Sequence, residues 1–95
     1  MNQSAPGDAI VARLRELVQD ALRPQELLIR DESAAHAGHG TAGGKGHYRM
    51  HIVSDRFSGL SRIERHRLVH EIVRSVFDTH VHALALRTLT PDEKH

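Results

Sequence analysis

The pattern of apolar and polar positions predicts an amphipathic helix near the start of the chain. Over residues 8–22, apolar side chains recur at the i, i+3, i+4 spacing that places them on one helical face. Asp8 is expected to cap the helix, and Pro24 is expected to stop it. The polar residues 1–7, which include Gly and Pro, are expected to form a flexible tail. We therefore assign residues 8–95 to the folded domain.

A second helix is predicted from Ser61 to about Asp78. Ser61 and Glu64 have capping-box spacing, in which each side chain accepts a hydrogen bond from the other residue's backbone amide. Val73 falls on the apolar arc of this helix, so it is expected to point into the core. A final turn is expected after Thr90, because Pro follows it in the first helical position.

Three shorter segments have the composition or the alternation of strands, namely 26–32, 47–54 and 81–88. The segment between the first two, 33–46, holds five of the seven glycines and is expected to form a loop. The strand side chains expected to point toward the helices are Leu27, Ile29, Tyr48, Met50, Ile52, Leu84 and Leu86.

The predicted order is therefore α-β-β-α-β in a single small α+β domain. The first two strands pair as a hairpin, and the third follows a helical crossover, which makes it parallel to the second. The economical arrangement is a three-stranded mixed sheet with helices covering it.

The amino-acid composition limits the kinds of core and functional site that the chain can form. The 95 residues are 39% hydrophobic but only 3% aromatic, so the core must be aliphatic. The absence of cysteine excludes disulfides and thiolate metal sites, and it agrees with a cytoplasmic location. No apolar run approaches the length of a membrane span. The net charge is +1 with neutral histidines and would reach +10 with all nine protonated, most of that change falling between about pH 5 and 8.

Several segments together closely resemble the BolA family. They are Asp31-Glu32-Ser33, His36, His47-Tyr48, Val53-Ser54-Asp55-Arg56-Phe57-Ser58-Gly59-Leu60-Ser61, Arg65-His66-Arg67 and Val81-His82-Ala83-Leu84-Ala85. The resemblance implies a sheet-and-helix fold similar to a class II KH domain. It also implies an adaptor that binds a monothiol glutaredoxin through a shared two-iron, two-sulfur (2Fe-2S) cluster, in iron–sulfur cluster trafficking or iron regulation.

The resemblance assigns two metal ligands, His82 and His36. A histidine at a strand edge most often makes a local hydrogen bond, but His82 matches the family's cluster-ligating histidine at the start of the last strand. His36 matches the family's second ligand on the glycine-rich loop, and His39 from the same loop is a possible substitute. In this arrangement glutaredoxin supplies one thiolate and its bound glutathione supplies another.

Three other histidines have simpler interpretations. His66 and His70 have the one-turn spacing of some zinc sites, but the Glu of the H-E-x-x-H motif is missing and arginines flank the pair. We expect both to be structural, with His66 packed beside Ile63 and making one hydrogen bond. His80 and His82 are expected on one strand face, where they offer two imidazoles to a metal but have no third ligand at clear spacing.

Arginines around the second helix support an alternative function. Residues 55–72 resemble a helix-turn-helix fragment, with Ser58-Gly59 as the turn. Some members of the BolA family are DNA-binding regulators of stress response and cell morphology. The nucleic-acid candidates in this alternative are Arg56, Arg62, Arg65 and Arg67. Against it, acidic residues dilute the patch, and both the KH G-x-x-G clamp and aromatic stacking residues are lacking.

No nucleophile elbow or comparable catalytic context is present, so the chain is expected not to be an enzyme. We expect the free domain to be a monomer or a weak homodimer, with no membrane attachment. Its expected partner is the glutaredoxin, with DNA as the alternative.

Overall fold

A computed structural model confirms the predicted α+β fold. It describes residues 6–33 and 46–94, with the backbone alone at residues 6–8 and at His82. The elements in chain order are α1 (Pro6–Leu22), β1 (Glu26–Asp31), β2 (Gly46–Val53), the 3-10 turn η3 (Asp55–Phe57), α2 (Arg62–Ile72), α3 (Arg74–His80), β3 (Val81–Leu89) and the 3-10 turn η4 (Pro91–Glu93).

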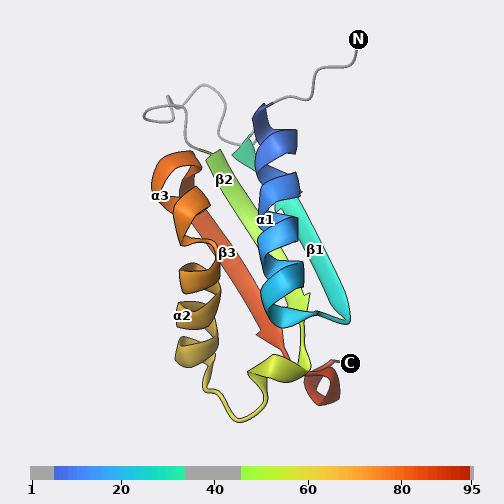
Figure 1. The fold of residues 1–95 in the computed structure, drawn as a ribbon. Helices are drawn as coiled ribbons and strands as arrows, with labels where there is room; N and C mark the ends of the chain where they lie inside the picture. Colours follow the sequence, from blue (N-terminus) through green and yellow to red (C-terminus); the bar gives the residue numbers. More distant parts are fainter. Residues whose placement is uncertain (1–5, 34–45, 95) are drawn as a thin grey trace.

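The three strands form one mixed sheet in the order β1-β2-β3. β1 and β2 are antiparallel, with Glu26 opposite Val53, and β2 and β3 are parallel, as the crossover topology predicts. The helices α1, α2 and α3 all lie over the same face of the sheet (Figure 1). Within the described residues, no helix is long and apolar enough to cross a lipid bilayer.

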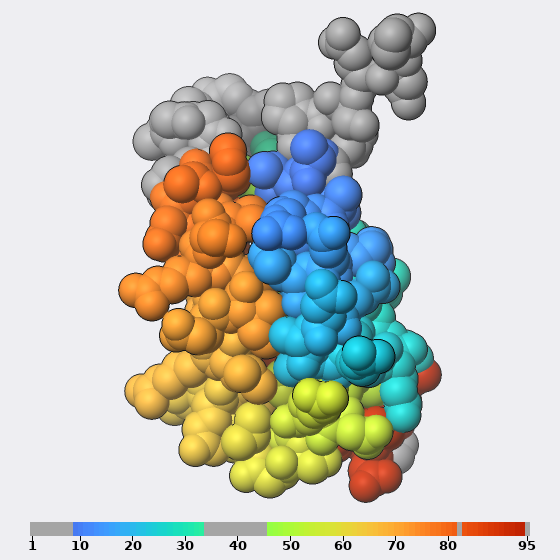
Figure 2. All heavy atoms as spheres, in the orientation of Figure 1, coloured from blue at the N-terminus to red at the C-terminus, as the bar shows by residue number. Residues whose placement is uncertain are grey.

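The core lies between this helical layer and the sheet. Alternate residues of β2 point into it, as predicted, and the side chains of Met50 and Ile52 are fully buried. In Figure 2 the helices pack closely on this side, with α1 beside the α2–α3 pair. The other large, fully buried apolar residues are Leu14, Val18, Val53, Phe57, Val69 and Val73.

The first helix begins earlier than predicted. α1 starts at Pro6, a favourable first helical residue, so Asp8 lies inside the helix and does not cap it. The C-terminal end agrees with the prediction. Arg23 takes the left-handed conformation (φ 43°) before Pro24, and its amide donates to the Gln19 carbonyl at 3.1 Å.

The prediction of one continuous helix up to Asp78 is wrong. The capping box at Ser61 and Glu64 is present as predicted, but α2 ends at Ile72 and α3 follows from Arg74. Neither Gly nor Pro stands at the break, so no local sequence signal marks it. α3 contacts both α1 and β3, and this tertiary packing overrides the helical propensity of the segment.

Val73 stands at this break and is fully buried. We expect Val73→Asp to abolish cooperative unfolding, because the substitution places an unpaired carboxylate in the core. The matched control is Ser75→Asp, an exposed position on α3, which should retain a melting temperature close to the parent value. Thermal denaturation followed by circular dichroism compares the two. A parent-like melt for Val73→Asp would show that the core is misassigned.

Candidate functional site at the loop end of the sheet

Ser33 links the end of β1 to the beginning of β2, the two points at which segment 34–45 joins the described chain. Its hydroxyl oxygen accepts a hydrogen bond from the His47 amide at 3.0 Å, and its own amide donates to Asp31 Oδ1 at 2.9 Å. The Glu32 amide also donates to the His47 carbonyl at 2.8 Å. The end of β1 and the beginning of β2 are therefore fixed to each other at the base of the loop.

We call this group of contacts the clamp, and Tyr48 and Gly46 also belong to it. Burial and, secondarily, the nearby Asp31 carboxylate raise the pKa of Tyr48, while a hydrogen bond with Ser33 opposes that rise. A Cβ atom at Gly46 would lie 2.5 Å from Ser33 Oγ and 2.9 Å from the Tyr48 ring. Only glycine fits here without displacing these groups.

The beginning of β3 lies directly beside the clamp. Gly46 is opposite Val81 and His47 is opposite Ala83, so the register shifts by one residue and passes over His82. Val81 is buried in the core, which anchors the backbone just before His82. An irregularity of this kind re-aims side chains relative to regular alternation and is common beside functional sites. The face of His82 therefore does not follow from the alternation of Leu84 along the strand.

The predicted ligands are placed to different extents. The backbone of His82 stands at the start of β3, as predicted, and its side chain lies outside the described part of the structure. His36 and His39 also lie outside the described residues. The prediction that His80 shares a strand with His82 is wrong, because His80 is the last residue of α3. Over 6–33 and 46–94, no group of three or more His, Asp or Glu side chains is arranged to hold a metal.

His66 and His70 occupy different environments on α2. His70 packs edge-to-face against Phe77 of α3, with ring centroids 5.0 Å apart, and so has the structural role that was predicted. His66 is half-buried, and this burial, followed by the charges of Arg62 and His70, lowers its pKa. Ile63, one turn before His66 on the same helix, is 64% exposed, whereas Val69 and Val73 are fully buried.

Arg65 is an internal structural residue, which sequence analysis missed when it grouped Arg65 with the surface arginines. Its side chain is only 11% exposed. The guanidinium donates to the Leu60 carbonyl at 2.9 Å and to the Thr88 carbonyl at 3.1 Å. It also binds both Glu93 carboxylate oxygens, at 2.6 and 3.1 Å, and lies over the Phe57 ring. A bidentate pair of this kind adds geometric specificity as well as energy.

The other arginines of the nucleic-acid group are exposed. Arg62 and Arg67 project from α2, and Arg56 extends from η3, where its Nη1 donates to the Ala21 carbonyl at 3.4 Å. The expected helix-turn-helix is wrong, because only the three-residue 3-10 turn η3 precedes the Ser58-Gly59 turn. Gly59 in that turn has φ 82°, a conformation that favours glycine.

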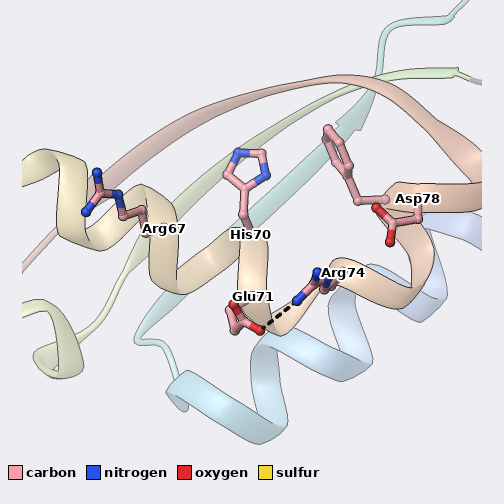
Figure 3. A pocket seen from close by; sticks show the side chains of 6 residues that line it. Arg67, His70, Glu71, Arg74 and Asp78 are labelled. Carbon is pink, nitrogen blue, oxygen red and sulfur yellow. Dashed lines mark hydrogen bonds and ion pairs between the residues drawn. The ribbon is translucent and has the colours of Figure 1, made fainter.

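An open hollow of about 420 Å³ lies along α2 and α3 (Figure 3). Arg67, His70 and Phe77 line it together with a surface ion pair between Glu71 and Arg74, at 3.4 Å. Its charges are mixed, since Asp78 also lines it. The hollow therefore does not extend the arginine group into a continuous basic surface.

The features described so far define a small α+β domain with a mixed sheet covered by helices on one face, in which hydrogen bonds join the end of β1 to the start of β2 beside the start of the last strand. The family model for BolA-like proteins matches residues 18–93. The chain belongs to this family, as its motifs predicted.

Individual relatives agree with this assignment. Protein BOLA1, chloroplastic, of Arabidopsis thaliana is 44% identical over 88 residues, which cover 86% of this chain and 54% of the relative. BolA-like protein 1 of Mus musculus is 42% identical over 88 residues, covering 93% and 63%. The chain thus spans between about half and two thirds of these relatives. The solved structure of BolA1 from Arabidopsis thaliana matches with a TM-score of 0.79 at 38% identity, over 90% of this chain and 96% of that one.

The pair between Arg65 and Glu93 predicts a specific acid sensitivity. The Arg65 hydrogen bonds, followed by the Thr90 amide, lower the pKa of Glu93 from 4.5 to about 2. A depressed carboxyl pKa stabilises the fold above the unfolded-state value and loses that contribution as pH falls through the folded-state value. Glu93→Gln should therefore be less stable than the parent near neutral pH, and the difference should shrink between pH 4.5 and about 2.

Urea denaturation of parent and variant across this range measures the difference. Glu71→Gln, which removes the carboxylate of an exposed surface pair, is the control and should differ little from the parent at any pH. A deficit of Glu93→Gln that is the same at every pH would show that the carboxylate charge does not provide the stabilisation.

Proposed function

We propose that this BolA-like protein is a non-enzymatic adaptor that binds a monothiol glutaredoxin through a shared 2Fe-2S cluster. In this role it would take part in iron–sulfur cluster trafficking or iron regulation. Membership in the family supports the proposal, together with the positions of Ser33, Gly46 and the His82 backbone within the fold.

One observation carries most of the weight. Gly46 at the start of β2 is paired with Val81 at the start of β3, so the loop base and His82 occupy the same end of the sheet. The clamp around Ser33 holds the other end of the loop, which carries His36, at this place too. The segment whose sequence includes His36 thus joins the described chain at Ser33 and Gly46, next to the start of the strand that includes His82.

The donor set suits the cluster that the proposal names. Imidazole nitrogens ligate iron, and two of them on one iron of a 2Fe-2S cluster raise its reduction potential relative to cysteine ligation alone. This chain has no cysteine, so His36 and His82 would serve one iron. A glutaredoxin thiolate and the thiolate of its bound glutathione would serve the other. Both imidazoles donate only when neutral, so acid should weaken the assembly.

The cellular setting is also part of the proposal. A cytoplasmic location was expected from composition, whereas one relative is named chloroplastic and another, the SufE-like protein 1 of Arabidopsis thaliana, chloroplastic/mitochondrial. In any of these compartments, the proposed partner of this chain is a monothiol glutaredoxin. Without it the domain would be a monomer or a weak homodimer.

The proposal is tested by comparing how strongly substitutions at His82 and His36 weaken the cluster complex. His82→Ala should abolish the visible circular dichroism signal that forms when the protein is mixed with cluster-loaded monothiol glutaredoxin. The reason is that His82 is held by a strand whose neighbour Val81 is buried. His36→Ala should weaken or alter the signal, since His39 lies on the same loop. His36→Cys should retain binding with a changed spectrum and a lower potential.

His66→Ala is the matched control, because it removes an imidazole from α2 and leaves both ligands in place. Far-ultraviolet circular dichroism must show that every variant is folded. The proposal fails if His82→Ala forms the parent complex while folded His66→Ala does not.

DNA binding is the second candidate, favoured by the exposure of Arg56, Arg62 and Arg67 near the start of α2. The internal position of Arg65 counts against it, because a guanidinium bound to Glu93 is not available to phosphate. The same exposed arginines would also serve as an ordinary solvated surface.

Titration of duplex DNA at increasing salt separates the two functions. For the adaptor we expect only weak, sequence-independent affinity. A regulator would bind one sequence tightly with a steep salt slope, reduced by about one unit for each phosphate-binding arginine removed. The double variant Arg62→Gln and Arg67→Gln measures this slope change, and a reduction of about two with retained sequence preference would favour the regulator.

A further inference from the structure

The sheet face that the helices leave uncovered has an unusual set of side chains. Each strand contributes one exposed arginine to it, namely Arg30 in β1, Arg49 in β2 and Arg87 in β3. Strands lie about 4.8 Å apart, so β1 and β3 are roughly 10 Å apart, with Arg49 directly opposite Arg30 and Arg87 displaced along the sheet to the position beside His51. We call this surface, made of these arginines with Leu28 and His51, the open face.

Two of these cations are placed directly against each other. Arg30 and Arg49 are cross-strand partners in the antiparallel pair of β1 and β2. Like charges in this position destabilise a sheet. Arg49 has a carboxylate at hand, because its Nε donates to Glu32 Oε2 at 3.1 Å. The Arg30 side chain makes no hydrogen bond or ion pair within 6–33 and 46–94, and the sequence between those ranges contains no Asp or Glu. The repulsion between the two strands is thus only partly offset.

Next to these cations lies an apolar contact point. Leu28 is 65% exposed and is the cross-strand partner of His51. Leu28, Arg30, Arg49 and His51 enclose a shallow hollow of about 120 Å³ whose exposed surface is mostly apolar. His51 is in turn the β2 partner of Arg87. The exposed Leu28 is therefore flanked by Arg30, Arg49 and His51, with Arg87 on the far side of His51.

We propose that the open face binds an acidic, amphipathic segment of a partner protein, with carboxylates on the arginines and an apolar side chain over Leu28. Charge complementarity supports this occupant, because carboxylates would relieve the repulsion between Arg30 and Arg49. Nucleic acid fits less well. The described residues of the open face include no Phe, Tyr or Trp on which bases stack.

The proposal is tested with a synthetic peptide of alternating Glu and Leu, labelled for fluorescence anisotropy at low salt. The comparison ligands are a peptide of alternating Gln and Leu, poly-glutamate and duplex DNA. We expect binding of the Glu–Leu peptide to exceed that of the Gln–Leu peptide and to weaken as salt is added. In NMR spectra the peptide should shift backbone amides of β1, β2 and β3 and leave those of α2 and α3 unchanged.

Variants locate the binding contacts. Arg30→Gln and Arg87→Gln should each weaken peptide binding about threefold, as expected for one exposed charge pair. Leu28→Ser should weaken binding of the Glu–Leu peptide and leave poly-glutamate unaffected. Arg67→Gln, an exposed arginine on the helical side, is the matched control and should have no effect.

The melting temperature distinguishes an arginine that binds the peptide from one that only stabilises the fold. Because Arg30→Gln removes a cation opposite Arg49, it should weaken binding while leaving the melting temperature equal to or above the parent value. The proposal is overturned if amide shifts fall on α2 and α3, if Arg67→Gln weakens binding as much as Arg30→Gln, or if DNA binds to the open face and the peptide does not. None of these outcomes depends on a cluster or on glutaredoxin.

Discussion

The guanidinium of Arg65 is the constraint around which one end of the molecule is organised. A cation with so little exposure requires partners on every side, and the chain supplies them from three separate segments: the turn at Leu60, the end of β3 at Thr88, and η4 through Glu93. The capping box that begins α2 sets the direction of the helix, and Arg65 then ties that helix to the sheet. Arg65 thereby links η4 to both α2 and the end of β3.

The parts of the fold that sequence predicts well are those governed by local rules. Alternation along β2 predicts that Met50 and Ile52 are buried, and the spacing of Ser61 and Glu64 predicts where α2 begins. The break at Val73 lies beyond such rules, because no residue there disfavours a helix by itself. It depends on contacts with α1 and β3, which become visible only when the whole domain is assembled.

The candidate site likewise has parts that the sequence predicts and parts that depend on tertiary structure. Motifs identify His82 and strand order brings it near the loop base, but the register shift after Val81 has no signature in the sequence. Composition likewise treats all arginines alike. Only the tertiary structure distinguishes Arg65 from Arg30. The Arg65 guanidinium is bound by carbonyls and a carboxylate, whereas Arg30 is paired with another cation, Arg49. The spacing between Arg65 and Glu93 is too long for any local pattern to have indicated their pairing.

The clamp around Ser33 and Gly46 also makes the folding of the domain independent of the amino-acid sequence of segment 34–45. Its hydrogen bonds are made by backbone groups and by residues outside 34–45, so they are indifferent to what lies between. Loop-closure entropy rises slowly with length, by about 0.6 kcal/mol for each doubling. Insertions, deletions and composition changes in 34–45 should therefore accumulate in related proteins at little thermodynamic cost. This arrangement lets the sequence of segment 34–45 change while the sheet beside it stays constant.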